Sequence, residues 1–257
     1  MDLGLQGKVA IVTGGSRGIG RAAAALLLRE GAQVVVSSVR PESAREAARQ
    51  LAPLGRVEAV PCDVAVEGDV VALVRETLRL FNSLDILVAN AGTGGRYTNL
   101  IDMSAADWDA MLNVHLRGAF LCGRETARAM RDRKIPGRIV TVSSTAVYEG
   151  DPLLGHYNAA KSGVIGLTRS MAADFAPWGI RVNGVAPGWV HTDMTAADLP
   201  APGTRIPNLG VLERAGLAEE IAPAIVFLAS NVSDFLTGAT LVVDGGQIIA
   251  GPRPRWE

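Results

Sequence analysis

The sequence predicts one α/β domain spanning residues 1–257, built on a doubly wound parallel sheet of about seven strands with helices on both faces. Short apolar runs alternate with helical segments along the chain, and a glycine-rich loop separates the first run from the first helix. Such alternation is typical of a parallel sheet with right-handed crossovers. The 257 residues suffice for one large core, and no linker or repeat divides them.

The composition excludes several classes of protein. The formal net charge of −1 gives no reason to expect nucleic acid or an anionic membrane as a partner. No apolar run reaches the ~18 residues of a membrane span, and the first residues contain no signal segment. The isolated Cys62 and Cys122 predict neither a disulfide nor a metal site, and the three histidines lack ligand spacing. We therefore expect a cytoplasmic protein without a metal.

The first strand and helix enclose a loop that suits a dinucleotide. Val9 to Val12 is an apolar run that predicts a buried strand, and an Ala- and Leu-rich helix covers residues 21–30. The intervening glycines allow a tight turn and close approach to a pyrophosphate, while the helix N-terminus supplies amide donors. The spacing Gly14-x-x-x-Gly18-x-Gly20 differs from G-x-G-x-x-G, so a turn that merely needs glycine is the alternative.

The end of the second strand, residues 33–38, bears on the choice of cofactor. An acidic residue there would bind the adenosine ribose hydroxyls. This chain has Ser38 instead, with Arg40 two positions later and Arg17 in the glycine loop. A serine and two guanidinium groups favour a 2′-phosphate, and therefore NADP over NAD. The alternative is that Arg40 begins a solvated helix face.

The remaining elements continue the alternation. Helices are predicted at residues 42–54, 66–81, 104–130, 161–175 and 217–229, and strands at 57–62, 84–88, 138–142, 180–186 and 240–243. A capping box at Ser104–Asp107 starts the longest helix. Residues 145–156 are predicted as a loop, 189–213 as a substrate-binding loop or lid, and 247–257 as a tail without periodicity.

Tyr157 and Lys161 form the best candidate pair for chemistry. At positions i and i+4 of a helix, their side chains lie on one face. A free tyrosine titrates near about 10, and an adjacent positive charge lowers that pKa toward the range suited to acid–base work. One such pair is weak evidence by itself, because chance pairs on solvated helix faces are common.

Taken together, these motifs resemble the classical short-chain dehydrogenase/reductase (SDR) family over nearly the whole chain, from Lys8 to Gly246. The matching pieces are Thr13–Gly20, Asp63-Val64, Asn90-Ala91-Gly92, Asn113, Ser144, Tyr157-x-x-x-Lys161, Pro187-Gly188 and Val243–Gly246. Ser144, rather than Ser143, has the family's spacing from Tyr157. Ala89 is a mild departure, since the family often has asparagine there. The resemblance implies a Rossmann-like fold and a homotetramer.

The resemblance also implies a role for each matched residue. Tyr157 would be the general acid–base, and Lys161 would lower its pKa and bind the nicotinamide ribose. Ser144 would hydrogen-bond the substrate oxygen, and Asn113 would hold a water in a proton relay to Lys161. The implied cofactor-binding residues are Gly14, Ser16, Arg17, Gly18, Ile19, Gly20, Ser38, Arg40, Asp63, Val64, Asn90, Ala91, Gly92, Tyr157, Lys161, Pro187, Gly188, Val190 and Thr192.

Substrate contacts are predicted from the loops near Tyr157. Tyr148, His156 and Trp189 are the candidates, and Arg96 and Tyr97 are further ones. His156 could instead be solvated at the start of its helix, and His115 is interpreted as helix packing. We expect a mostly apolar pocket for a ketone or secondary alcohol.

The sequence thus predicts an NADP-preferring enzyme that interconverts a ketone and a secondary alcohol by hydride transfer. One alternative is the same chemistry with NAD, as an alcohol or polyol dehydrogenase. A second is a dinucleotide-binding regulator without catalysis, which has no need of Asn113, Ser144, Tyr157 and Lys161 together. A third is non-redox chemistry such as elimination, which the glycine loop and the motif at residues 90–92 disfavour.

Overall fold

The computed structural model describes residues 1–250 and contains one seven-stranded sheet. The strand order is β3-β2-β1-β4-β5-β6-β9, and every neighbouring pair is parallel. The strands are β1 (Val9–Thr13), β2 (Gln33–Ser37), β3 (Val57–Ala59), β4 (Ile86–Ala89), β5 (Arg138–Val142), β6 (Arg181–Pro187) and β9 (Thr240–Val243). The predicted doubly wound, Rossmann-like fold is confirmed. The third strand is shorter than predicted, because the ladder with β2 ends at Ala59.

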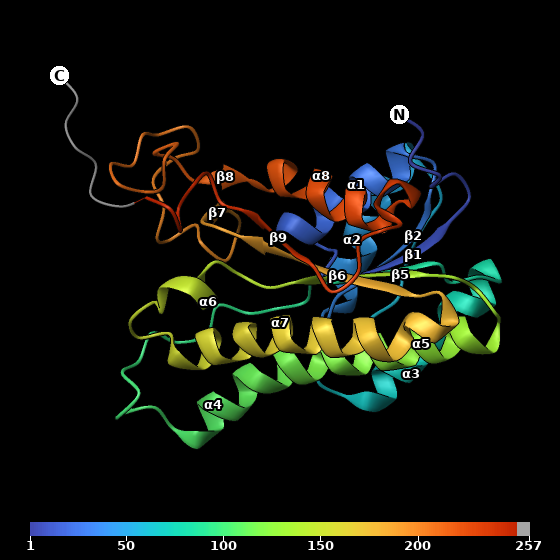
Figure 1. Ribbon diagram of the computed structural model, residues 1–257, viewed down its shortest axis with the longest axis horizontal. Helices are drawn as coiled ribbons and strands as arrows, with labels where there is room; N and C mark the ends of the chain where they lie inside the picture. Colours follow the sequence, from blue (N-terminus) through green and yellow to red (C-terminus); the bar gives the residue numbers. More distant parts are fainter. Residues whose placement is uncertain (251–257) are drawn as a thin grey trace.

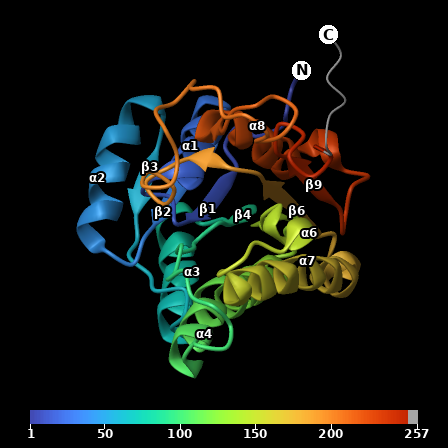
Figure 2. The same cartoon turned by 90° about the vertical axis from the view of Figure 1, so that its left-hand side faces the viewer.

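Helices cover both faces of this sheet (Figures 1 and 2). One face carries α1 (Gly18–Arg29), α2 (Pro41–Leu51) and α8 (Ala218–Ala229), and the other carries α3 (Glu67–Phe81), α4 (Ala105–Leu112), α5 (Gly118–Asp132) and α7 (Gly155–Phe175). Alternate residues of one strand pack on opposite faces: Ala10 and Val12 join the cluster under α1 and α8, and Ile11 joins the cluster under α3 and α5. The strands are therefore apolar throughout, as buried parallel strands must be.

The long helix predicted to follow Ser104 is interrupted. Ser104 caps α4 by accepting a hydrogen bond from the Asp107 N–H at 3.0 Å. A π-helical turn, Asn113–Arg117, then separates α4 from α5, and the Gly118 N–H bonds to the Asn113 carbonyl. The wider turn changes which side chains face the sheet. Such turns are frequent at functional sites.

Short elements missed by the sequence analysis lie at the carboxyl ends of the strands (Figure 1, left; facing the viewer in Figure 2). Helix α6 (Ala146–Glu149) interrupts the predicted loop after β5. Strands β7 (Val190–His191) and β8 (Gly216–Leu217) pair across the predicted 189–213 loop. That loop is also tied to the turn after β9, because the N–H groups of Val211 and Leu212 donate to the Gly245 carbonyl. Within residues 1–250, no helix is long and apolar enough to cross a membrane.

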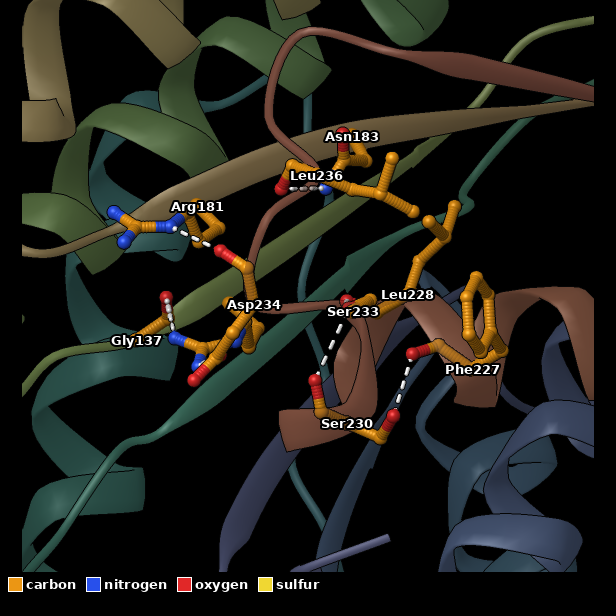
Figure 3. Close-up of polar contacts among 10 residues, drawn as sticks. Gly137, Arg181, Asn183, Phe227, Leu228, Ser230, Ser233, Asp234 and Leu236 are labelled. Atoms are coloured by element: carbon orange, nitrogen blue, oxygen red, sulfur yellow. Dashed lines mark hydrogen bonds and ion pairs between the residues drawn. The ribbon is translucent and has the colours of Figure 1, made fainter.

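Polar contacts close the opposite end of the sheet (Figure 3). Asn183 of β6 donates to the Leu236 carbonyl at 2.9 Å, and Arg181 donates to the Asp234 carbonyl at 3.0 Å. Ser230 donates to the Phe227 carbonyl at 2.6 Å, satisfying a carbonyl at the end of α8. These contacts fix the segment that connects α8 to β9 against the amino end of β6.

Candidate active site

A cleft of about 540 Å³ opens where β1, β2, β4, β5 and β6 end. The carboxyl edge of an open parallel sheet is where ligands bind, because the loops there diverge to either face. The glycine loop after β1, the end of β4 and the start of α7 all contribute to its lining. Three of the four side chains predicted to be catalytic lie in this cleft: Ser144, Tyr157 and Lys161.

The glycine loop is fixed by the end of β4. Gly14 has a φ of +63°, and the Asn90 amide donates to the carbonyls of Thr13 and Gly14 at 3.0 and 3.2 Å. Gly20 does not line the cleft, contrary to its predicted role as a cofactor contact. A Cβ there would lie 2.4 Å from the Gly14 carbonyl oxygen, so Gly20 allows the helix to approach the loop. Asn90 and Gly20 thus fix the shape of the glycine loop.

The predicted 2′-phosphate residues lie at one end of the cleft. Ser38, Arg40 and Arg17 all line it, and Arg40 is exposed there. The Arg17 guanidinium also lies 3.6 Å from the exposed Asp193 carboxylate, across the mouth of the cleft. That exposed ion pair is weak, so it competes little with a phosphate for Arg17.

The other predicted cofactor contacts, apart from Gly20, line the same cleft: Gly14, Ser16, Gly18, Ile19, Asp63, Val64, Asn90, Ala91, Gly92, Pro187, Gly188, Val190 and Thr192. A Cβ on Gly18 would lie 3.1 Å from Thr192 Cγ2, so the glycine loop and the segment after β7 almost touch over the cleft. Further lining residues that the sequence analysis missed include Thr93, Val114, Val142, Met194 and Thr195. Val142 ends β5, Val114 lies in the π-helical turn, and the other three follow β4 or lie in the long loop, where sequence alone gives no register.

Lys161 is buried beneath Tyr157. It is 5% exposed, its Nζ donates to the Val142 carbonyl at 2.8 Å, and Nζ lies 5.7 Å from the centre of the Tyr157 ring. Helix α7 begins at Gly155, so the two residues share its first turns and one face. Burial lowers the pKa of Lys161 to about 8, because desolvation penalises the ammonium form.

The pKa of Tyr157 differs from the sequence prediction. Burial raises it, and the hydrogen bond from Ser144 lowers it by a smaller amount. The prediction that Lys161 brings the pKa of Tyr157 down is therefore not met here, since desolvation exceeds every favourable contact. The phenol is held protonated, which suits a proton donor.

The π-helical turn presents His115, and not Asn113, to the cleft. Asn113 is exposed and does not line the cleft, and its role in a water relay to Lys161 stays a prediction. His115 is 3% exposed, and its ring meets the Tyr157 ring edge-on, with 5.4 Å between centroids. The predicted packing role of His115 is thus incomplete. In a regular helix these two residues lie about 200° apart, so only one of them can face the sheet.

His115 also forms a hydrogen bond with the segment that follows β4. Its Nε2 lies 3.0 Å from the Thr93 nitrogen and 2.8 Å from the Thr93 oxygen, while its buried Nδ1 has no hydrogen-bond partner within the described chain. A Cβ on Gly92 would lie 2.6 Å from His115 Cε1. Burial, with the nearby Lys161 charge, lowers the pKa of His115 to about 3. The imidazole is therefore neutral at physiological pH.

A second cavity of about 140 Å³ lies on the other side of Tyr157. Ser144 and Tyr157 line both this cavity and the cleft. Of the predicted substrate contacts, Trp189 and Tyr97 line the second cavity. Tyr148 is 52% exposed and lines neither space, while His156 is 1% exposed and lines neither. His156 is thus not solvated, because Gly95 lies against its ring, and its role as a substrate contact stays a prediction.

Other residues of the second cavity were not predicted. Asp151, Asp198 and Gln247 line it, from the loop after α6, the long loop and the predicted tail. Gln247 accepts a hydrogen bond from the Trp189 N–H at 3.1 Å and donates to Glu149 at 2.8 Å. The first residues of the tail therefore belong to the site, and residues 251–257 lie outside the described chain. No periodicity marks such contacts in the sequence.

Comparisons with known proteins agree with this geometry. The family model described as enoyl-(acyl carrier protein) reductase matches residues 14–247. A 3-oxoacyl-[acyl-carrier-protein] reductase from Synechocystis is 40% identical over 248 residues, covering 95% of this chain and 98% of the relative. A cis-4-hydroxycyclohexanecarboxylate dehydrogenase from Sinomonas cyclohexanicum is 43% identical over 243 residues, covering 93% of this chain and 96% of the relative.

A solved structure has the same architecture. A short-chain type dehydrogenase/reductase from Mycobacterium marinum superimposes with a TM-score of 0.88 at 32% identity, covering 95% of this chain and 96% of that one. The match extends over both cavities, since it covers nearly the whole chain.

Proposed function

Because the chain belongs to the short-chain dehydrogenase/reductase family of oxidoreductases, we propose that it interconverts a ketone and a secondary alcohol with a nicotinamide dinucleotide. The observation that carries this proposal is the position of Ser144 and Tyr157, which line both the cleft and the second cavity. A carbonyl oxygen between these hydroxyls would have its carbon facing the cleft. The relatives named for a 3-oxoacyl group and for a hydroxycyclohexane ring act on a ketone and a secondary alcohol.

The residues of the cleft fit a dinucleotide. The Gly14 turn and the N-terminus of α1 offer backbone amides to a pyrophosphate, and a Cβ on Gly14 would approach Ala91 Cα within 2.9 Å. Asp63 and Val64 would meet the adenine, Lys161 the nicotinamide ribose, and Val190 and Thr192 the carboxamide. The bound cofactor would supply or accept the hydride.

The chain's own groups would manage the proton. In ketone reduction, negative charge develops on the substrate oxygen, and Ser144 and Tyr157 are neutral donors that can stabilise it. Burial raises the pKa of Tyr157, so the phenol is protonated at neutral pH, and it would release that proton to the substrate oxygen as negative charge develops there. The Lys161 ammonium beneath the ring would stabilise the phenolate that remains. Alcohol oxidation would run through the same groups in reverse.

We also propose a preference for NADP. The end of β2 carries Ser38 in place of a carboxylate, and the side chains of Arg17 and Arg40 line the cleft beside it. The Arg40 side chain forms no ion pair within the described chain, and Arg17 has only an exposed pair with Asp193. Both guanidinium groups are therefore free to bind a 2′-phosphate, which an NAD-specific carboxylate would repel.

A paired fluorescence titration with NADPH and NADH tests this preference. We expect Arg40→Ala to weaken NADPH binding about 10-fold or more, the value of a charge-assisted hydrogen bond, with NADH binding unchanged. Arg45→Ala is the matched control, since Arg45 is exposed on the same helix and does not line the cleft. NADH binding as tight as NADPH binding, and unmoved by Arg40→Ala, would identify an NAD-linked alcohol or polyol dehydrogenase instead.

Two other proposals remain to be separated from this one. A catalytically idle dinucleotide-binding regulator would bind NADPH without turning over any ketone or alcohol, although it would not need Ser144, Tyr157 and Lys161 together. Non-redox chemistry would proceed without a change in the absorbance of NADPH.

A homotetramer and a cytoplasmic location stay predictions. Gly166 of α7 has no atom of residues 1–250 near its Cβ position, which leaves that part of the helix face open to a second copy.

A further inference from the structure

The size and charge of the second cavity indicate which substrates it can hold. This inference rests on the proposed redox function. It has a volume of about 140 Å³ and opens onto the Ser144 and Tyr157 hydroxyls from the side away from the glycine loop. A compact carbon skeleton would fill it, since a ring of six carbons has a volume near that size. Whatever occupies this space lies within reach of the reacting oxygen.

The charged groups of this cavity are all acidic. Asp151 and Asp198 line it, and no Lys, Arg or His is among the described residues that do so. The Asp198 carboxylate accepts a hydrogen bond from the Tyr97 hydroxyl at 3.1 Å. The two carboxylates therefore face the substrate space without a neutralising cation.

Asp151 is the carboxylate that has no partner. Its backbone carbonyl accepts from the Asn158 amide at 2.9 Å, but its carboxylate has no hydrogen bond or ion pair within the described chain. Burial raises the pKa of Asp151, and its charge raises the pKa of both Tyr97 and Tyr157. Asp151 thus lies close enough to influence the reacting phenol, and its acceptor oxygens remain unused.

The rest of the lining combines apolar side chains with uncharged polar ones. Leu154, Trp189 and Met194 provide side-chain surface, and Gly94 and Gly95 leave room beside it. A Cβ on Gly95 would lie 2.2 Å from Met111 Cε, so this wall cannot take a larger residue without repacking. An apolar skeleton with one donor group aimed at the carboxylates complements such a surface.

We propose that this cavity selects compact alcohols or ketones that carry a second hydroxyl or ammonium group, and rejects substrates that carry a carboxylate. A hydroxyl or ammonium donates a charge-assisted hydrogen bond to Asp151 or Asp198. A substrate carboxylate would be placed beside two like charges, on the half-buried Asp151 and the exposed Asp198, and like charges at close range repel each other. Selection therefore comes from both attraction and repulsion.

Four cyclohexanols that differ in one substituent test this proposal. The probes are cyclohexanol, 1,4-cyclohexanediol, 4-aminocyclohexanol and 4-hydroxycyclohexanecarboxylate, each assayed for kcat/KM with NADP⁺. We expect the diol and the amino alcohol to exceed the carboxylate at least about 30-fold, from one gained hydrogen bond and one avoided repulsion. In Asp151→Asn we expect that ratio to fall about 10-fold, because one of the two charges is lost.

Asp102→Asn is the matched control, because Asp102 is an exposed carboxylate that lines neither space. It should leave the substrate ranking unchanged. Binding of the same four compounds to the enzyme saturated with NADPH, which cannot accept a hydride from an alcohol, is followed by tryptophan fluorescence and provides a readout that does not depend on turnover.

The outcomes separate this inference from the proposed function. If no compound is oxidised but binding still ranks by charge, and Asp151→Asn compresses the ranking, the selectivity stands and the proposed redox function fails. If the carboxylate is bound and oxidised as well as the amino alcohol, or if Asp151→Asn changes nothing, the inference is overturned while the redox function stands. Absence of both turnover and charge-dependent binding contradicts the two together.

Discussion

The two ends of the same sheet use their polar groups in opposite ways. At the amino end, the Asp85 carboxylate accepts from the Val9 N–H at 3.0 Å and pairs with Lys8 at 3.1 Å. Arg138 pairs with Asp234, and Asn183 bonds to the Leu236 carbonyl (Figure 3). At the carboxyl end, Lys161 is buried without a carboxylate partner, and His115 Nδ1 has no partner within the described chain.

The polar groups at the amino end of the sheet therefore contribute to stability, and those at the carboxyl end are available to bind a ligand. Strand ends expose backbone groups and the side chains that follow, and a buried polar group without a partner is costly. The amino end satisfies most such groups from within the chain, although the buried Arg138 Nε and Thr240 Oγ1 have no partner among the described residues. The carboxyl end leaves donors and acceptors directed at a cleft and a cavity, where a ligand can satisfy them. Substitutions at the two ends should therefore change different measurements.

Tyr157→Phe should have the largest effect on activity. It removes only the phenol oxygen and keeps the ring edge against His115. We expect kcat to fall about 10³-fold, the size of a general acid–base contribution, while NADPH affinity and the melting temperature stay close to those of the wild type. Steady-state kinetics, beside a fluorescence titration, measure the two quantities. A loss of kcat smaller than about 10-fold would show that another group transfers the proton.

Asn183→Ala should have the next largest effect, and on stability alone. Asn183 is 1% exposed, and it accepts from the Ala239 N–H at 3.1 Å besides donating to Leu236. Its removal leaves the half-buried Leu236 carbonyl and Ala239 N–H without that partner, so we expect the free energy of unfolding to fall by about 2 kcal/mol. Urea denaturation measures this change.

The control for the amino end is the exposed Gln50→Ala, which should change the unfolding free energy by less than about 0.5 kcal/mol. The folded fraction of Asn183→Ala should bind NADPH as the wild type does. If the affinity of Asn183→Ala for NADPH drops instead, the two ends of the sheet are coupled, and stability and ligand binding are not separated between them.

The sequence predicted the scaffold because the scaffold follows local rules. Apolar runs such as Val9–Val12 mark buried strands, and a glycine loop before an Ala-rich helix marks the phosphate site. Gln33–Ser38 and Arg138–Val142 lie within one residue of β2 and β5. Each of these signals lies within a few residues of the chain, so no long-range contact is needed to interpret it.

The parts that failed depend on contacts distant in sequence. Whether Asn113 or His115 faces the cleft depends on a π-helical turn, which no propensity predicts. The rise in the pKa of Tyr157 comes from burial, which is a property of the packed site. Asp151 and Gln247 meet across the second cavity from segments about a hundred residues apart, and neither belongs to a motif.

His115→Phe should have the smallest effect of the three, and it tests the residue of the π-helical turn that lines the cleft beside Tyr157. The phenyl ring keeps an edge contact with Tyr157 but loses Nε2, which leaves the Thr93 backbone without its partner. We expect kcat to fall about 10-fold with little change in KM, since His115 positions Tyr157 and the chain after β4.

The pH dependence distinguishes this positioning role from a proton-transfer role for His115. Because the pKa of His115 is lowered to about 3, the imidazole stays neutral from pH 5 to 8, and protonation cannot produce a step in kcat within that range. We therefore expect parallel pH profiles for the wild type and His115→Phe. A step near pH 6.5 that is present in the wild type and absent from the variant would mean that His115 itself carries a proton, whereas an unchanged kcat would mean that it positions nothing.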